Sequence, residues 1–147
     1  MAEEVVLQTE KEFDIRFSEV DSMQIVWHGS YALYFEDARE EFGRKYQLEY
    51  MRMYEFGFLA PLVELKFNYK RPLKYQDRAK VVIKFRNTNA AKLIFDYEIY
   101  DLKTNELCVT GYTTQVFLDT NYNLMWTLPP FIKEWKKMHN QIGRAHV

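Results

Sequence analysis

The feature that most constrains the fold is alternation of apolar and polar residues through the second half of the chain. After Pro61 it has the two-residue period of half-buried β-strands in three stretches, at residues 65–69, 79–85 and 93–99, and a longer strand-like run follows at 107–118. The short polar segments NTNA and KTNE separate the later stretches. Such short connections favour antiparallel pairing, because parallel strands need a long crossover. An earlier stretch, EFDIRF, alternates in the same way and predicts a fifth strand.

A helical pattern follows that first strand. Apolar residues recur at spacings of three and four on one face of a helix predicted for residues 31–46, with Ser30 as its N-cap. The residues of this face are Tyr31, Tyr34, Phe35, Ala38 and Phe42. A shorter helix is expected within residues 46–57, and another begins at the prolines 129–130. One long helix among five strands is an α+β pattern, and burial is simplest if the sheet wraps the helix.

Composition narrows the class of protein. The 147 residues predict one domain, 1–147, whose last few residues form a flexible tail. A net charge of −1 gives no reason to expect nucleic acid. With one cysteine and no pair of histidines at metal-ligand spacing, we expect neither an internal disulfide nor a metal site. No signal peptide is visible in MAEEVVLQTEKEF, and no stretch approaches the ~18 consecutive apolar residues of a membrane span, so a cytoplasmic location is expected.

Residues 18–42, SEVDSMQIVWHGSYALYFEDAREEF, gather polar groups ahead of the long helix. Glu19 and Asp21 precede an apolar run, and His28 follows it. An ionised carboxylate can attack a carbonyl or take a proton from water, while free amides at a helix N-terminus stabilise a developing oxyanion. These groups suit acyl transfer without a metal. The spacing also fits solvated turn residues and a structural histidine, so both interpretations stay open at this point.

A longer pattern begins at Asp21. It consists of Asp21, Ile25, Val26, Trp27, His28, Tyr31, Phe35, Glu36, Ala38 and Arg39. This pattern, followed by NYKRPLKYQD and TQVFLD, resembles the hot-dog-fold acyl-CoA thioesterases of the 4-hydroxybenzoyl-CoA thioesterase type, including bacterial enzymes linked to the Tol–Pal envelope system. The resemblance implies an α+β hot-dog fold, in which a five-stranded antiparallel sheet wraps a long central helix. It also implies an enzyme that hydrolyses an acyl-CoA thioester to a free acid and CoA.

The resemblance implies roles for individual residues. Asp21 matches the catalytic carboxylate, which is a nucleophile or a general base depending on the family member. His28 matches the residue whose amide points at the thioester carbonyl, and whose imidazole helps to orient water or substrate in some members. Glu19 replaces a supporting aspartate, Gln24 a common glycine, and Ser30 an asparagine at the start of the helix. The other residues expected to shape this loop are Trp27, Gly29 and Tyr31.

Four basic residues near the end of one strand are a candidate binding site for the phosphates of CoA. They are Lys66, Lys70, Arg71 and Lys74. Charge that protects an exposed strand edge is the alternative interpretation. Because CoA is part of the substrate, no separate cofactor is expected. Glu64 is either a second acid of the pocket or a surface residue, and the aromatic residues of the later strands either line an acyl tunnel or pack the core.

Partners and alternative functions follow from the same resemblance. It implies a homo-oligomer, a dimer or a tetramer, with the site between subunits. Hydrolysis of thioesters on acyl carrier protein, by the same fold, is one alternative function. A non-catalytic acyl-CoA binder or scaffold is another, and it would leave a bound thioester intact.

Overall fold

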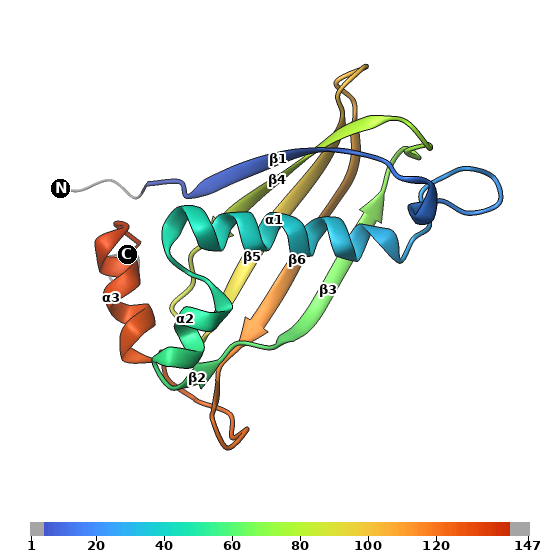
Figure 1. Ribbon diagram of the computed structural model, residues 1–147. Coiled ribbons are helices and arrows are strands. Elements are labelled where there is room, and N and C mark those ends of the chain that lie inside the picture. Colours follow the sequence, from blue (N-terminus) through green and yellow to red (C-terminus); the bar gives the residue numbers. More distant parts are fainter. Residues whose placement is uncertain (1–4, 142–147) are drawn as a thin grey trace.

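A curved antiparallel sheet of five strands is the largest part of the molecule (Figure 1). The computed structural model describes residues 5–141. In order across the sheet, the strands are β1 (Gln8–Asp14), β4 (Arg78–Arg86), β5 (Lys92–Asp101), β6 (Leu107–Val116) and β3 (Leu62–Tyr69). Every neighbouring pair is antiparallel, as the alternation predicts. β1 and β3 are therefore the two edges of the sheet.

The long helix α1 (Ser30–Tyr46) crosses the inner face of this sheet (Figure 1). Its apolar face is buried: the ring of Phe35 stacks on Tyr97 of β5 at 4.0 Å, and Phe42 meets Phe95 edge-on at 5.0 Å. Gly111 of β6 makes this close approach possible, because a Cβ there would lie 2.8 Å from the Phe35 ring and 2.1 Å from the Lys66 carbonyl oxygen. The prediction of a sheet wrapped around a central helix is confirmed.

Smaller elements close the end of the molecule where α1 finishes. They are α2 (Tyr50–Glu55), a two-stranded sheet of β2 (Phe58–Leu59) and β7 (Leu118–Asp119), and α3 (Pro130–Met138). Trp135 of α3 donates its indole N–H to the carbonyl oxygen of Tyr46 at 2.7 Å. Both shorter helices were expected. The run predicted as one strand over residues 107–118 is wrong in its last part, because β6 ends at Val116 and Phe117 turns into the core.

The N-terminal strand also differs from its prediction. β1 begins at Gln8 and ends at Asp14, and a single 3₁₀ turn (Phe17–Glu19) replaces the predicted end of the strand. No helix among residues 5–141 is long and apolar enough to span a membrane. The predicted C-terminal tail lies outside the described residues.

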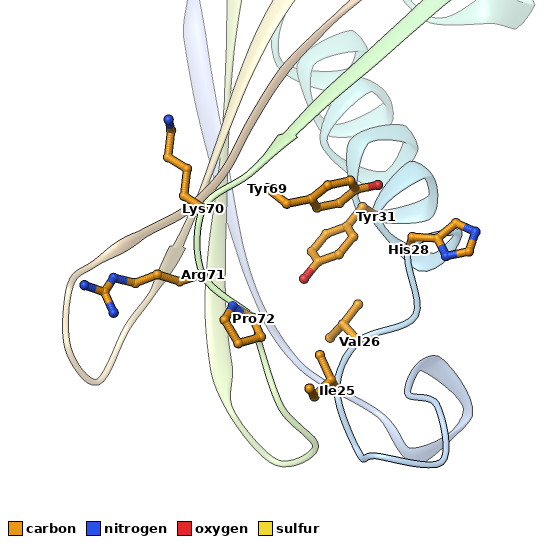
Figure 2. A pocket seen from close by; sticks show the side chains of 8 residues that line it. All are labelled: Ile25, Val26, His28, Tyr31, Tyr69, Lys70, Arg71 and Pro72. Atoms are coloured by element: carbon orange, nitrogen blue, oxygen red, sulfur yellow. The ribbon is translucent and has the colours of Figure 1, made fainter.

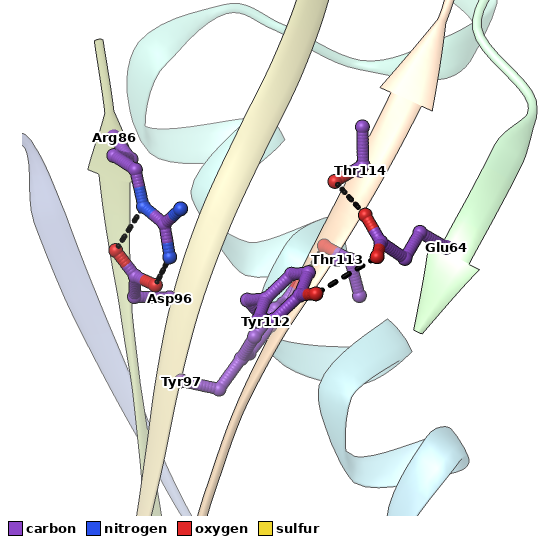
Figure 3. Close-up of polar contacts among 7 residues, drawn as sticks. All are labelled: Glu64, Arg86, Asp96, Tyr97, Tyr112, Thr113 and Thr114. Atoms are coloured by element: carbon purple, nitrogen blue, oxygen red, sulfur yellow. Dashed lines mark hydrogen bonds and ion pairs between the residues drawn. The ribbon is translucent and has the colours of Figure 1, made fainter. Parts of the chain in front are cut away.

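The outer face of the sheet is polar (Figure 3). Glu64 accepts hydrogen bonds from the Tyr112 hydroxyl at 2.8 Å and the Thr114 hydroxyl at 3.2 Å, and Arg86 forms an ion pair with Asp96. Glu64 is thus a residue of the outer face, and the interpretation as a second acid of the pocket is wrong. Among the aromatic residues of the later strands, Phe95, Tyr97 and Phe117 are buried in the core.

Candidate active site

The loop before α1 is tied down at both ends. Val20 and Val26 form an isolated antiparallel bridge, and Ile25 forms another with Lys74 in the β3–β4 connection. The Val26 amide donates to the carbonyl oxygen of Leu73 at 2.8 Å. These bonds hold residues 20–26 against the β3–β4 connection, ahead of the first turn of α1.

Asp21 closes a tight turn within this loop. Its Oδ1 accepts hydrogen bonds from the amides of Met23 at 2.8 Å and Ile25 at 3.3 Å. Gln24 takes a left-handed backbone conformation with φ 63°, which glycine adopts most readily, and this explains why a glycine suits the position. Oδ2 of Asp21 accepts no hydrogen bond from any described residue. One carboxylate oxygen therefore serves the turn, and the other has no donor among the described residues, although Asp21 is not one of the residues that line the neighbouring cavity.

The same turn occurs a second time, at Asp119. There Oδ1 accepts from the amides of Asn121 at 2.8 Å and Asn123 at 3.0 Å, and Tyr122 has φ 66°. In both turns the aspartate amide also donates to the carbonyl oxygen four residues later, at 2.9 Å. A turn of this kind is thus an ordinary local structure, and the surroundings of Asp21 must supply whatever makes it reactive.

Glu19 ties this loop to the long helix. It is buried, and its Oε1 accepts hydrogen bonds from the Tyr34 hydroxyl at 3.1 Å and the Arg16 amide at 2.8 Å. Its Oε2 forms an ion pair with Arg16 Nε at 3.2 Å. Burial, together with the charge of Glu19, raises the pKa of the Tyr34 hydroxyl. The phenol thus stays a hydrogen-bond donor at neutral pH, in keeping with the supporting role expected for Glu19.

The start of α1 differs from the predicted cap. The helix begins at Ser30 with Gly29 in the cap position, and the Ser30 hydroxyl donates to the Glu19 carbonyl oxygen at 3.0 Å. The N-cap prediction for Ser30 is therefore wrong, because a tertiary contact engages its hydroxyl. The backbone amides of His28 and Gly29 donate to no acceptor among the described residues. They are two unpaired donors at the positive end of the helix.

Two aromatic side chains shape this corner. The indole of Trp27 packs over Gly29, where a Cβ would lie 2.1 Å from the nearest ring atom, so the loop needs glycine there. The Trp27 ring also contacts the His28 ring, with centroids 4.9 Å apart. The His28 imidazole is exposed and directed away from Tyr31 (Figure 2). In this geometry it is the amide of His28, rather than its ring, that belongs to the helix end.

A cavity of about 300 Å³ lies between this loop, the first turn of α1 and the end of β3 (Figure 2). Its inner wall includes Val26 and the buried Tyr31, whose ring is 5.4 Å from that of Tyr69. Burial raises the pKa of Tyr31 to about 12, so the phenol is neutral at physiological pH. Tyr69 and Pro72 also line the cavity, and the sequence analysis did not single them out. The only feature of the sequence that could have pointed to them is their position on either side of Lys70 and Arg71.

The four basic residues proposed for CoA are separated in the structure. Lys70 and Arg71 lie at the margin of the cavity, but their side chains point away from its interior (Figure 2). Arg71 forms an ion pair with Glu106 at 2.9 Å. Lys66 pairs in register with Tyr112 and therefore lies on the outer face, while Lys74 is in the β3–β4 connection. The structure thus brings two of the four to the cavity.

The arrangement defines a class of enzyme. An open carboxylate oxygen and two unpaired amides at a helix N-terminus belong to one short loop beside a cavity. A sheet wrapped around a central helix carries that loop. These are the groups that the resemblance assigns to a hot-dog-fold thioesterase, because free amides at a helix N-terminus can stabilise an oxyanion that forms beside a carboxylate.

Comparison with known proteins agrees. A sequence model of the thioesterase-like superfamily matches residues 15–136, and the chain belongs to that family. It is 30% identical over 111 residues to the putative acyl-CoA thioesterase YneP of Bacillus subtilis, which covers 76% of this chain and 80% of that protein. The DHNA-CoA thioesterase of Staphylococcus aureus superposes with a TM-score of 0.78 at 26% identity, over 90% of this chain and 91% of that one.

A plant thioesterase is also similar to this chain. The chloroplastic acyl-acyl carrier protein thioesterase ATL3 of Arabidopsis thaliana is 27% identical over 77% of this chain and 60% of that protein. The family and fold confirm the prediction of a hot-dog thioesterase, and the chain is a thioester hydrolase. The narrower resemblance to enzymes of the Tol–Pal system stays a prediction.

Proposed function

We propose that this enzyme hydrolyses acyl-CoA to a free acid and CoA at the Asp21 loop. The observation that carries the proposal is that one short loop carries two kinds of group. One is the Asp21 Oδ2, which accepts no hydrogen bond from a described residue, and the other is the two unpaired amides of His28 and Gly29. Removal of a single oxyanion donor costs roughly 10²–10³ in rate in other enzymes, and a positioned base contributes about 10²–10⁴. The two parts together are enough for thioester hydrolysis without a metal.

Two routes through this geometry balance chemically. In the first, Asp21 attacks the thioester carbon and the CoA thiolate leaves, taking a proton from water. The hydroxide left behind attacks the mixed anhydride, which gives the free acid and regenerates the Asp21 carboxylate. In the second, Asp21 takes a proton from a water that attacks directly, and that proton passes to the leaving thiolate. In both routes the carbonyl oxygen becomes negative while the amides of His28 and Gly29 donate to it.

Release of free thiol from short, long and aromatic acyl-CoAs tests the proposal, with Asp21→Asn beside the wild type. Asparagine can still close the turn through its side-chain oxygen, so the fold is kept while the charge is lost. Asp119→Asn is the matched control, because Asp119 closes the same turn elsewhere. We expect a loss of at least about 10²-fold for Asp21→Asn and little change for the control. Equal rates in all three proteins would refute the role of Asp21.

Acyl carrier protein thioesters are the second candidate substrates, and the plant relative is the observation that favours them. Thiol release from acyl carrier protein but from no CoA ester would select them. A bound thioester that stays intact for hours would instead indicate a binder. The cytoplasmic location, the absence of a separate cofactor and CoA binding by Lys70 and Arg71 stay predictions.

We further propose that two copies pair along β3. One edge of β3 bonds to β6, and the other faces no described strand. Apolar side chains of β3 lie exposed, including Val63 (59%), Tyr69 (54%) and Leu62 (41%). A free, apolar strand edge is a template for pairing, and a two-fold dimer closes it. Sedimentation tests this proposal: a species of 17.8 kDa at micromolar concentration would contradict it.

A further inference from the structure

A groove of about 460 Å³ lies between α2 and α3, at the end of the molecule where α1 finishes (Figure 1). Most of its wall is apolar and comes from Phe56, Phe131, Trp135 and Met138. α1 is 17 residues long, so the groove at one end of this helix and the Asp21 loop at the other are about 25 Å apart. No step of the proposed hydrolysis uses this groove.

The floor of the groove is apolar and fixed in place. The Trp135 side chain is buried, and its indole N–H already donates to the Tyr46 carbonyl oxygen at 2.7 Å. The Phe131 ring packs against that of Phe56, with centroids 4.6 Å apart. Phe131, Trp135 and Met138 follow one another at spacings of four and three residues, which makes a stripe about 10 Å long on one face of α3. A stripe of this kind suits a hydrocarbon chain.

The other side of the groove offers hydrogen-bond donors. Arg52 of α2 bonds through its Nε to Glu49 at 3.3 Å, while its two Nη groups donate to no residue in the described part of the chain. The side-chain amide of Gln47 likewise makes no hydrogen bond within residues 5–141. A guanidinium with free Nη groups fits the two oxygens of a carboxylate. Glu134 is the acid of the lining, and Lys137 offsets its charge in an ion pair at 3.5 Å.

We propose that this groove binds a free carboxylic acid with an apolar chain. The carboxylate meets Arg52 and Gln47, and the chain lies along the stripe on α3. The apolar wall alone accepts any hydrocarbon, whereas the guanidinium favours a chain that ends in a carboxylate. That such an acid is the enzyme's own product rests on the proposed function, but its binding needs no turnover. The groove then holds the product at the far end of α1 from Asp21.

A matched pair of ligands tests the class of compound. Octanoate and octan-1-ol share the same apolar chain, and only octanoate carries a carboxylate. In calorimetric titration we expect octanoate to bind with a Kd of about 1 mM or below, and octan-1-ol to bind about three- to fivefold more weakly. Decanoate should bind more tightly than octanoate, by up to about fourfold for each methylene that finds apolar contact. Absence of octanoate binding at several millimolar would overturn the proposal.

Arg52→Gln tests the position of the carboxylate. It removes the charge at an exposed side chain, so we expect octanoate to bind only as well as octan-1-ol, whose own affinity stays the same. Arg44→Gln is the control, because Arg44 is an arginine of α1 that is also ion-paired and is not among the lining residues. An unchanged affinity for octanoate in Arg52→Gln would place the acid elsewhere, the cavity beside Asp21 included, and overturn the proposal.

Met138→Ala tests the position of the chain. Met138 is 73% exposed, so its loss does not disturb the core, and we expect octanoate and octan-1-ol to weaken together by about threefold or more. Met51→Ala is the control, since Met51 is an equally exposed methionine of α2 outside the lining. If no acid binds and Met138→Ala instead weakens self-association in sedimentation, a second copy of the chain covers the groove and the proposal is wrong.

The proposal and the hydrolysis fail separately. Asp21→Asn keeps the whole groove, so it should bind octanoate as the wild type does, and Arg52→Gln should keep the wild-type kcat/KM for acyl-CoA. Thiol release that depends on Asp21, without octanoate binding, would refute the acid site alone. Octanoate binding that depends on Arg52, without thiol release from any acyl-CoA, would refute the proposed function and leave the acid site standing.

Discussion

Replacement of Glu19 by alanine tests how the reactive loop is held. The buried carboxylate accepts from the Tyr34 hydroxyl, the Arg16 amide and the Arg16 guanidinium. The Arg16 side chain is 72% exposed, so its ion pair is worth less than about 1 kcal/mol, and its amide can bond to water. The buried Tyr34 hydroxyl would lose its partner, at about 1–3 kcal/mol. We therefore expect Glu19→Ala to lower the free energy of unfolding by roughly 1–4 kcal/mol.

Thermal and urea unfolding measure this loss. For a chain of this length, each kcal/mol lowers Tm by roughly 2–4 °C, so the fall in Tm is about 2–16 °C. Tyr34→Phe removes one donor and leaves the other two bonds, and we expect it to cost about half as much. Glu49→Ala is the control, because Glu49 forms an ion pair with Arg52, also three positions away in the sequence, at an exposed site. It should change the free energy of unfolding by less than about 0.5 kcal/mol.

The alternative is that the Glu19 carboxylate takes part in the chemistry. In that case Glu19→Ala would be nearly as stable as the wild type, while thiol release would fall by orders of magnitude at a temperature where both proteins are folded. That result would refute the supporting role. A loss of activity that tracks the fraction of folded protein is the outcome we expect.

Two further predictions concern β6 and the free edge of β3. Gly111→Ala would place a methyl group 2.1 Å from the Lys66 carbonyl oxygen. We expect this substitution to lower the free energy of unfolding in urea by more than about 3 kcal/mol. A smaller loss would mean that β3 or α1 shifts easily. Leu65→Lys puts a charge on an apolar position of the free edge, and we expect monomers in sedimentation with little change in the unfolding of the chain itself. A dimer of unchanged affinity would show that β3 is not the interface.

Much of the fold could be predicted from the sequence because its periodicities are local. A two-residue period reports which face of a strand is buried, and three- and four-residue spacings do the same for α1, so the sheet and its central helix followed directly. The misplaced features depend on distant contacts. Ser30 has the sequence position of an N-cap, but its hydroxyl donates to the carbonyl oxygen of Glu19 instead. The strand predicted over residues 107–118 stops where the ring of Phe117 packs against that of Phe58, with centroids 5.6 Å apart.

The site was harder to predict because its parts are not marked by spacing. Asp21 and Asp119 close the same turn, with the same amide contacts and the same left-handed third residue after the aspartate. Only the surroundings differ: Asp21 shares its loop with the unpaired amides at the start of α1 and lies beside the end of β3. The proposed function therefore places reactivity where this common turn meets a helix end. If Asp21→Asn and Asp119→Asn are equally stable but only the first loses activity, that difference in surroundings, and not the turn itself, is what makes this aspartate catalytic.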